Sequence, residues 1–473
     1  MFINALYAIF LLVITDYWAT ERRGKMTKVI TYGTFDLFHE GHYSLLKRAK
    51  ALGDYLIVGV TTEHFDENRG KLNVVDSLMD RIAHVQATGL VDKIIIEDHV
   101  GQKIEDVQKY HADIFVLGSD WTGKFDYLKE YCKVVYLDRT RGISSTMLRN
   151  ENYEMVRLGM IGAGRIANRF IPEARFVSGV TVEGVFNHRL ARAQTFAKNH
   201  ELAFATDNIE ELFDRVNAVN IALPHEYHYE YAKKALEHGL HVLCEKPLAL
   251  KKSEAEELFK IAKAKNLVLM EAVKTAYAPG FIRLLSMAKS GIIGRIMDVE
   301  AAFTRILPEH NVREFNDYEY GGSFTEYGSY TLLPIIKFLG AGYKSIKFRS
   351  FYDENGVDLY TKAYFDYGQA LATAKTGISI KSEGQLLVSG TEGYILVPSP
   401  WWKPEGFEVC REDPTKNEKF YTRYLGDGLR YELADFVAAI NGTRDGEEFK
   451  LKRNESIAMA EVMEKFLEDK RGV

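Results

Sequence analysis

The sequence has little cysteine and no excess of charge of one sign. Its three cysteines among 473 residues, Cys132, Cys244 and Cys410, are far apart, odd in number and outside any C-x-x-C pattern. This argues against a disulfide framework or a cysteine-based zinc site and is typical of a reducing cytoplasm. The net charge of −5 is spread over interspersed acids and bases. The chain therefore lacks the basic stripe of a nucleic-acid protein and the polybasic patch of a membrane protein, which leaves small molecules as the expected partners.

Long apolar runs are also lacking, except for the uncharged stretch Met1 to Thr15. That stretch is too short to span a membrane comfortably, and it lacks the positive n-region of a signal peptide. Arg22-Arg23 can be encoded by AGG AGG, a ribosome-binding sequence, two codons before Met26. We therefore hypothesise that residues 1–25 are translated upstream DNA, which the intact mass of protein expressed from its native gene would test.

Two glycine loops of different kinds are present, and each follows an apolar strand and opens a helix. One is Gly33 to His42, which ends in His-Glu-Gly-His, and the other is Gly162 to Ala167, a GxGxxA pattern. A helix start offers unpaired N–H groups and a positive dipole end to a phosphate, so each loop predicts its own nucleotide site. A length of 473 residues requires several domains. We expect domains at 26–150, 156–275 and 276–473, of α/β class, in a bifunctional enzyme.

The first of these domains alternates strands with amphipathic helices, which predicts a parallel sheet with ligands at the carboxyl ends of its strands. Within it, His39 and His42 are three residues apart at a helix start, so their imidazoles can share one face. They could donate hydrogen bonds to the phosphates of a nucleoside triphosphate as charge develops there. A surface pair, or half of a metal site, is the alternative.

Four segments resemble the glycerol-3-phosphate cytidylyltransferase family of HxGH nucleotidyltransferases: Tyr32–Asp36, His39–His42, Asp120–Asp126 and Arg139–Thr146. The resemblance implies transfer of CMP from CTP to an alditol phosphate, with Mg²⁺ and without a covalent intermediate. His39 and His42 would then stabilise the transferring group. The other residues that the resemblance implies for nucleotide binding are Gly33, Thr34, Phe35, Asp36, Gly41, Arg139, Ser144, Ser145 and Thr146. Lys71, and with it Arg69, would be phosphate cations from a polar loop, while Arg81, Trp121 and Lys124 would meet the acceptor. The alternative for Arg139 and Lys71 is that they are solvated surface charges. The alternative for the hydroxyl residues at 144–146 is that they only cap a helix.

The second loop lies in a further series of alternating strands and helices, which predicts a Rossmann sheet with a cofactor site at Gly162, Gly164, Arg165 and Ile166. An acidic residue after the second strand would hold the ribose hydroxyls of NAD. The sequence there reads Asn187-His188-Arg189. We therefore expect NADP(H) rather than NAD(H).

From about Val156 to the C-terminus the chain resembles the glucose-fructose oxidoreductase and inositol dehydrogenase family, through Cys244–Pro247, Met270–Ala272 and Gly321–Tyr330. The resemblance implies Lys246 as a substrate-orienting and proton-relay residue and Tyr330 as the acid/base. A half-buried core aromatic is the alternative for Tyr330. Glu326 stands where the family often has aspartate. Further cofactor contacts are expected from Pro224, His228 and Glu245; His225 and His228 have no third ligand at metal spacing.

After Ala276 the pattern changes to long strands with few helices, which predicts an α+β open sheet that caps the substrate and favours a homodimer or higher homo-oligomer. Trp401-Trp402 could lie in the core or at an interface. The fusion suggests that the C-terminal part reduces a sugar or ketose phosphate to an alditol phosphate that the N-terminal domain activates with CTP, giving a donor for a surface polymer. Two alternatives stay open: cytidylylation before oxidation, and a C-terminal part that binds dinucleotide only to regulate.

Overall fold

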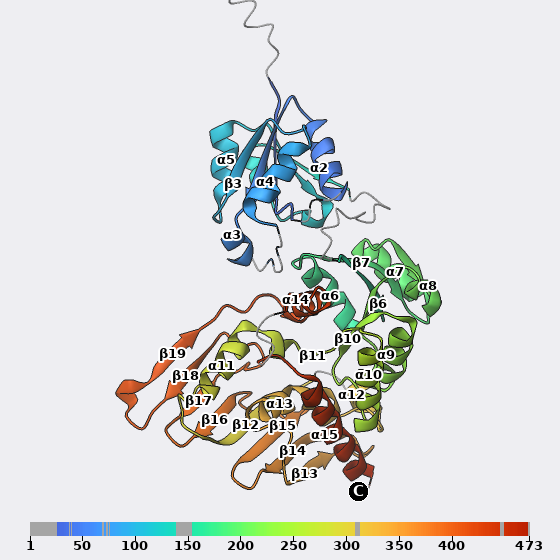
Figure 1. Cartoon of the computed structure of the whole chain (residues 1–473), viewed down its shortest axis with the longest axis vertical. Coiled ribbons are helices and arrows are strands. Elements are labelled where there is room, and N and C mark those ends of the chain that lie inside the picture. Colours follow the sequence, from blue (N-terminus) through green and yellow to red (C-terminus); the bar gives the residue numbers. More distant parts are fainter. Residues whose placement is uncertain are drawn as a thin grey trace, which may run out of the picture. The chain divides into compact units, whose positions relative to one another are not determined.

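The computed structural model describes residues 26–36, 38, 40–68, 71, 74, 76–138, 154–307, 313–444 and 449–471. The chain divides into two compact units, Met1–Asn150 and Glu151–Val473 (Figure 1). The hypothesis about residues 1–25 lies outside the described residues. Within the described ranges, no helix has both the length and the apolar character that crossing a bilayer requires.

The first unit holds a five-stranded parallel sheet in the order β3-β2-β1-β4-β5. Its strands are β1 (Lys28–Gly33), β2 (Tyr55–Thr61), β3 (Lys93–Glu97), β4 (Ile114–Gly118) and β5 (Lys133–Leu137). Its helices are α2 (Glu40–Lys50), α3 (Glu63–Asn68), α4 (Leu78–Ala87) and α5 (Gln102–Tyr110). Successive side chains of a strand point to opposite faces, so Val29 and Ile30 enter two different apolar clusters, one on each side of the sheet. The predicted doubly wound sheet is confirmed, and its order reverses between β1 and β4.

The second unit begins with a six-stranded parallel sheet in the order β11-β10-β9-β6-β7-β8, the arrangement of a Rossmann fold. The strands are β6 (Val156–Ile161), β7 (Val180–Phe186), β8 (Phe204–Thr206), β9 (Ala218–Ile221), β10 (His241–Glu245) and β11 (Leu269–Ala272). The helices are α6 (Arg165–Ala174), α7 (Leu190–His200), α8 (Ile209–Phe213), α9 (His228–His238) and α10 (Lys252–Ala264). Here the order reverses between β6 and β9, so the switch point lies beside the loop that holds Gly162.

An eight-stranded mixed sheet follows, in the order β13-β14-β15-β12-β16-β17-β18-β19. The strands are β12 (Ile296–Thr304), β13 (Ser345–Tyr352), β14 (Asp358–Asp366), β15 (Leu371–Gly377), β16 (Leu386–Gly390), β17 (Tyr394–Val397), β18 (Gly406–Cys410) and β19 (Glu418–Tyr421). Neighbouring strands are antiparallel except β12 and β15, which run parallel with Thr304 opposite Gly377. The open α+β sheet expected after Ala276 is therefore present.

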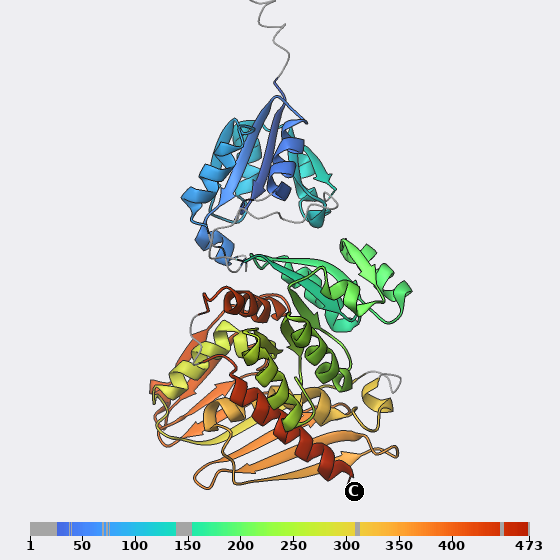
Figure 2. The same ribbon diagram turned by 45° about the vertical axis from the view of Figure 1, so that its right-hand side comes forward.

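Helices cover one face of the mixed sheet (Figure 2). They include α11 (Pro279–Lys289), α13 (Ser323–Leu339) and α15 (Arg453–Arg471), and α13 lies directly against β12 and β15. The short α12 (Arg313–Asn316) precedes α13, and α14 (Leu429–Ile440) lies against α6. Trp401 is fully buried and its indole N–H donates to the carbonyl of Ala302 (2.8 Å), so this tryptophan belongs to the core.

Candidate active sites

The loop between β1 and α2 carries the predicted cytidine nucleotide site. Phe35 in this loop has a φ of +55°, a left-handed value that residues other than glycine rarely adopt, and its side chain is buried. Its ring meets the His42 imidazole edge-on at a centroid distance of 5.4 Å, and the Phe38 ring lies 5.5 Å from the same imidazole. His42 is thus held by two aromatic rings in the first turn of α2, at the end of the sheet where phosphate would bind.

A buried polar network fixes this loop from behind. The Thr34 hydroxyl donates to Asp66 (3.1 Å), and the Thr61 hydroxyl donates to the other oxygen of the same carboxylate. Asp36 is also buried, and its carboxylate accepts the backbone N–H of Asp76 (2.8 Å). The hydroxyl and carboxylate of the Gly-Thr-Phe-Asp segment therefore tie β1 to the loops after β2.

Arg81 belongs to this network, and the prediction that it meets the acceptor is corrected. The side chain is fully buried. Its guanidinium donates to the carbonyl oxygens of Asp76 (3.0 Å), Thr34 (2.9 Å) and Thr61 (2.8 Å) and lies 3.6 Å from the Asp66 carboxylate. A cation with no exposed surface serves here to position the Thr34 loop.

Lys124 and Lys71, which were also predicted, differ in their exposure. The Lys124 ammonium is 5.0 Å from the centre of the Trp121 ring, a cation–π distance, and the Lys124 side chain is exposed. Lys71 is half-buried, and its backbone N–H donates to the carbonyl of Asp66 (2.8 Å). Gly33 ends β1, and Gly41 lies in the first turn of α2. Six further predicted residues lie outside the described residues: His39, Arg69, Arg139, Ser144, Ser145 and Thr146.

In the second unit, Gly162 makes the turn out of β6. Its φ is +108°, and a Cβ there would lie 2.4 Å from the carbonyl oxygen of Ala222, so only glycine fits. Gly164 differs, because a Cβ at this position would meet nothing within 4 Å. It is the N-cap of α6, with open space in front of a helix start, which suits a pyrophosphate.

The next strand, β7, ends where a ribose would lie. Asn187 is buried, and its side-chain oxygen accepts the backbone N–H of Arg189 (3.0 Å), while His188 and Arg189 are exposed. No carboxylate occurs among these three residues. The strand end therefore offers cationic and amide groups rather than the acid that NAD-specific sites use.

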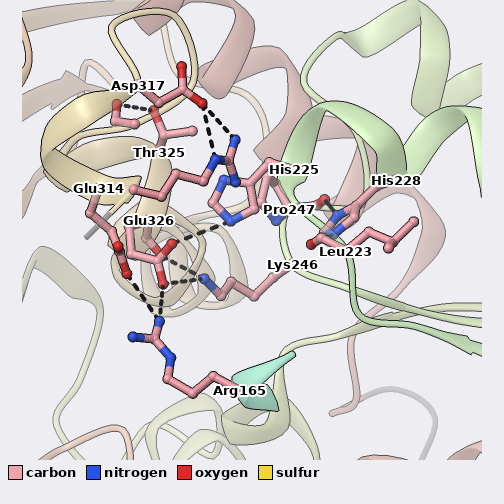
Figure 3. A network of polar contacts seen from close by, with 12 residues as sticks. Arg165, Leu223, His225, His228, Lys246, Pro247, Glu314, Asp317, Thr325 and Glu326 are labelled. Carbon is pink, nitrogen blue, oxygen red and sulfur yellow. Dashed lines mark hydrogen bonds and ion pairs between the residues drawn. The ribbon is translucent and has the colours of Figure 1, made fainter. Parts of the chain in front are cut away.

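Lys246 lies at the centre of a polar cluster that joins the two sheets of the second unit (Figure 3). Its ammonium donates to the carbonyl oxygen of Glu326 in α13 (2.7 Å) and lies 3.4 Å from the carboxylate of the same residue. The other oxygen of that carboxylate lies 3.4 Å from Nε2 of His225, and Arg165 pairs with Glu314 (3.1 Å). Glu326, which departs from the aspartate of the family pattern, thus reaches both Lys246 and His225.

Tyr330 lies one turn further along α13. Its ring is 5.9 Å from the Lys246 ammonium and stacks on Phe303 at a centroid distance of 5.0 Å. Burial raises the pKa of the Tyr330 phenol well above its usual value, so the hydroxyl keeps its proton at neutral pH. The Phe303 ring also stacks on Tyr327 (4.4 Å) and Trp402 (3.8 Å). The sequence had not singled out Phe303, although a residue at the carboxyl end of a strand is a place to look.

The prediction that His228 contacts the cofactor is corrected. Its side chain is fully buried, and its two ring nitrogens lie 2.7 Å from the carbonyl of Pro247 and 2.9 Å from that of Leu223. The ring joins the Lys246–Pro247 loop to the strand end at Leu223. His228 is therefore a positioning residue for Lys246.

These residues surround a cavity of about 990 Å³, large enough for a dinucleotide end together with a small substrate. Gly164, Arg165, Ile166, Pro224, Glu245, Lys246 and Tyr330, all predicted, line it. The lining holds eight lysines and arginines against three glutamates. Burial raises the pKa of the Glu245 carboxyl to about 7, and it lowers the pKa of Lys274 to about 8. Lys274, which directly follows the loop after β11, is a lining cation that the sequence reasoning missed.

Comparison with known proteins agrees with this division. Residues 30–151 match the family described as Cytidylyltransferase-like, and residues 156–273 match the Oxidoreductase family, NAD-binding Rossmann fold. A glycerol-3-phosphate cytidylyltransferase from Bacillus spizizenii is 53% identical over 126 residues, which are 27% of this chain and 97% of that protein.

The second unit has relatives of a different kind. A scyllo-inositol 2-dehydrogenase (NADP(+)) from Bacillus subtilis is 28% identical over 320 residues, 66% of this chain and 95% of that protein. The crystal structure of a 3-ketoreductase from Actinomadura kijaniata, with NADP and TDP-benzene, matches with a TM-score of 0.56 and 25% identity, covering 65% of this chain and 95% of that one.

Two nucleotide-binding sheets with their loops define a bifunctional enzyme, a nucleotidyltransferase joined to an NAD(P)-dependent oxidoreductase. The chain belongs to the glycerol-3-phosphate cytidylyltransferase family through its N-terminal domain, and the remainder is similar to NAD(P)-dependent inositol and sugar oxidoreductases.

Proposed function

We propose that the two domains catalyse consecutive steps: NADPH-dependent reduction of a ketose phosphate to an alditol phosphate, then transfer of CMP from CTP to that product. The CDP-alditol formed would serve as a donor for a cell-surface polymer. The observation that carries the proposal is the cation-rich cavity around Lys246 and Tyr330 in the same chain as a cytidylyltransferase domain. The product of the first reaction would then be the acceptor in the second.

In the reduction, NADPH supplies a hydride to the carbonyl carbon, and the carbonyl oxygen must gain a proton. Tyr330 is protonated and adjoins the Lys246 ammonium, so its hydroxyl would donate this proton. Lys246, held by Glu326, would hydrogen-bond the same oxygen and stabilise its developing charge. The exposed basic residues at 188–189 favour binding of the 2′-phosphate of NADP(H). A higher kcat/KM with NADH than with NADPH would contradict this preference for NADP(H).

In the transfer, an oxygen of the alditol phosphate attacks the α-phosphorus of CTP, and the bond from that phosphorus to the β-phosphate oxygen breaks, which releases pyrophosphate. His42, and with it His39, would donate hydrogen bonds to the transferring group, while Thr34 and Asp36 would line the pocket. Lys124 and Trp121 would contact the acceptor. The described residues contain no cluster of three or more potential metal ligands, so Mg²⁺ would be held mainly by the triphosphate.

Pyrophosphate release tests the proposal directly. The full-length protein is given CTP and a panel of glycerol, erythritol and ribitol phosphates, and then the matching ketose phosphates with and without NADPH. We expect release from one ketose phosphate only when NADPH is present. Release from an alditol phosphate with no NADPH oxidation by any ketose phosphate would refute the coupled sequence. A product time course would also show whether reduction precedes cytidylyl transfer.

A further inference from the structure

The single parallel pair in the described mixed sheet brings two basic residues to one place. Because β12 and β15 are parallel, their carboxyl ends meet at one edge of the sheet, with Thr304 opposite Gly377. Arg305 directly follows β12, and Lys381 lies four residues beyond the end of β15. The Lys381 ammonium donates to the carbonyl of Thr304 (3.2 Å), and the Arg305 backbone N–H donates to the carbonyl of Gly377 (2.9 Å). Both side chains line the 990 Å³ cavity.

Most other lysines and arginines of the cavity are engaged with acids. Their pairs are Arg165 with Glu314 (3.1 Å), Arg169 with Asp427 (2.7 Å), Lys403 with Asp427 (3.2 Å), Arg313 with Asp317 (2.9 Å) and Lys246 with Glu326 (3.4 Å). Lys274 donates to the backbone carbonyl of Asp427. Within the described part of the chain, Arg305 and Lys381 have no acidic partner. Two adjacent uncompensated cations at a cavity wall create a field that favours an anion.

An aromatic surface connects these cations to the reacting groups. Phe303 precedes Arg305 by two residues, and its ring stacks with Tyr327, Tyr330 and Trp402. The Tyr330 ring of this stack lies 5.9 Å from the Lys246 ammonium. Arg305 lies near Tyr327 of the same stack, where its charge opposes the increase in the pKa of that phenol caused by burial. A short carbon chain lying on the rings would have its carbonyl near Tyr330 and its far end near Arg305.

We propose that Arg305 and Lys381 bind the phosphate group of the oxidoreductase substrate and thereby select phosphorylated polyols and ketoses over unphosphorylated ones. This inference rests on the proposed function and adds the site that recognises the substrate. The coenzyme phosphates have a separate place, because Gly164 and the start of α6 belong to the other sheet of this unit. Guanidinium and ammonium groups together suit a phosphate dianion, with the guanidinium able to donate two parallel hydrogen bonds.

Steady-state kinetics with substrate pairs test this proposal. NADPH oxidation by the full chain is measured with dihydroxyacetone phosphate against dihydroxyacetone, and with pentulose 5-phosphates against pentuloses. For Arg305→Gln and Lys381→Gln, the ratio of kcat/KM for the phosphorylated to the unphosphorylated compound is expected to fall about 10- to 100-fold each. Lys347→Gln, which removes an exposed cation from β13 of the same sheet outside the cavity lining, should leave the ratio unchanged.

An unchanged ratio in Arg305→Gln and Lys381→Gln would overturn the phosphate site while leaving the proposed reductase intact. If no ketose phosphate is reduced, the proposed function fails. The phosphate site at Arg305 and Lys381 is then tested separately, by a measurement of phosphate binding. Inorganic phosphate is then titrated by calorimetry into the wild-type protein and the double variant, both saturated with NADP⁺ and CTP. The wild-type protein should bind one phosphate more than the double variant, and equal stoichiometry would overturn the inference.

Discussion

Replacement of Gly162 by alanine is expected to unfold the oxidoreductase unit at lower temperature without affecting the cytidylyltransferase domain. The added Cβ would lie 2.4 Å from the Ala222 carbonyl oxygen, so one of the two chain segments would have to move. Neither segment is free, because the Gly162 N–H donates to Phe186 and the Ala222 N–H donates to Ile161, both at 2.9 Å. A φ of +108° costs an L-residue a further 1–2 kcal/mol or so.

The steric and conformational costs together predict a loss of about 2–4 kcal/mol, since relief of the clash would also weaken one of those hydrogen bonds. For a unit of this size the loss corresponds to a decrease in melting temperature of roughly 3–6 °C. Differential scanning calorimetry measures it, and pyrophosphate release with an alditol phosphate serves as the internal check on the other domain.

Gly164→Ala is the matched control, because its φ of −90° suits any residue and its Cβ would meet nothing within 4 Å. We expect the control to melt within about 0.5 kcal/mol of the wild type. It should nevertheless bind NADPH more weakly, since the new methyl group would occupy the space in front of α6. If Gly162→Ala melted with the wild-type protein, the proposed turn geometry would be refuted.

Three further substitutions test other parts of the structure. Tyr330→Phe should lower hydride transfer about 10²- to 10⁴-fold while pyrophosphate release from an alditol phosphate continues, and full NADPH oxidation would exclude Tyr330 as the proton donor. Arg81→Gln should destabilise the N-terminal domain by about 3–5 kcal/mol because it removes a buried cation 3.6 Å from the Asp66 carboxylate and the donors to three backbone carbonyls, whereas the exposed Lys124→Gln should not. Equal melting temperatures would contradict the role given to Arg81. Glu271 is buried, which raises the pKa of its carboxyl from 4.5 to about 7. The free energy of unfolding that depends on protonated Glu271 is therefore fully present below about pH 4.5 and is lost as pH rises through 7. Between pH 5 and pH 8 this loss is on the order of 2–3 kcal/mol. In Glu271→Gln this part of the pH dependence of stability should vanish. Hydrogen exchange of the β10 and β11 amides in urea, at pH 5 and pH 8, measures the change. If the variant loses as much stability between the two pH values as the wild type, another group is responsible.

Local patterns predicted both parallel sheets well, because buried β-branched strands and glycine turns lie within a few residues of one another. The beginning of α13 shows where such reasoning fails. The helix begins at Ser323, and its N-cap is Gly322, which has no side chain to cap it. Its first turn is capped by Asp358 of β14, whose carboxylate accepts from the Ser323 hydroxyl (2.7 Å) and the Phe324 N–H (2.9 Å). A cap supplied by a distant strand leaves no local signal.

The candidate sites follow the same rule. Lys246 and Tyr330, which line one cavity, could be singled out because both lie in short recognisable segments. Arg81 and His228 were expected to contact ligands, whereas both side chains are fully buried and bonded to backbone carbonyls brought close by the fold. Residue type and spacing thus indicate which hydrogen bonds and ion pairs a side chain can make. Burial determines whether it makes them with a ligand or with other parts of the protein.

The parallel pairing of β12 with β15 also has a consequence for folding. Between these strands the chain makes α12, α13, β13 and β14, so their contact closes a long loop, and contacts of such high order form slowly. The hairpins β13-β14 and β14-β15 need no such closure. The N-terminal sheet, in contrast, is complete once Leu137 has left the ribosome. We therefore expect the cytidylyltransferase domain to acquire its fold during synthesis well before the edge that carries Arg305 and Lys381 exists.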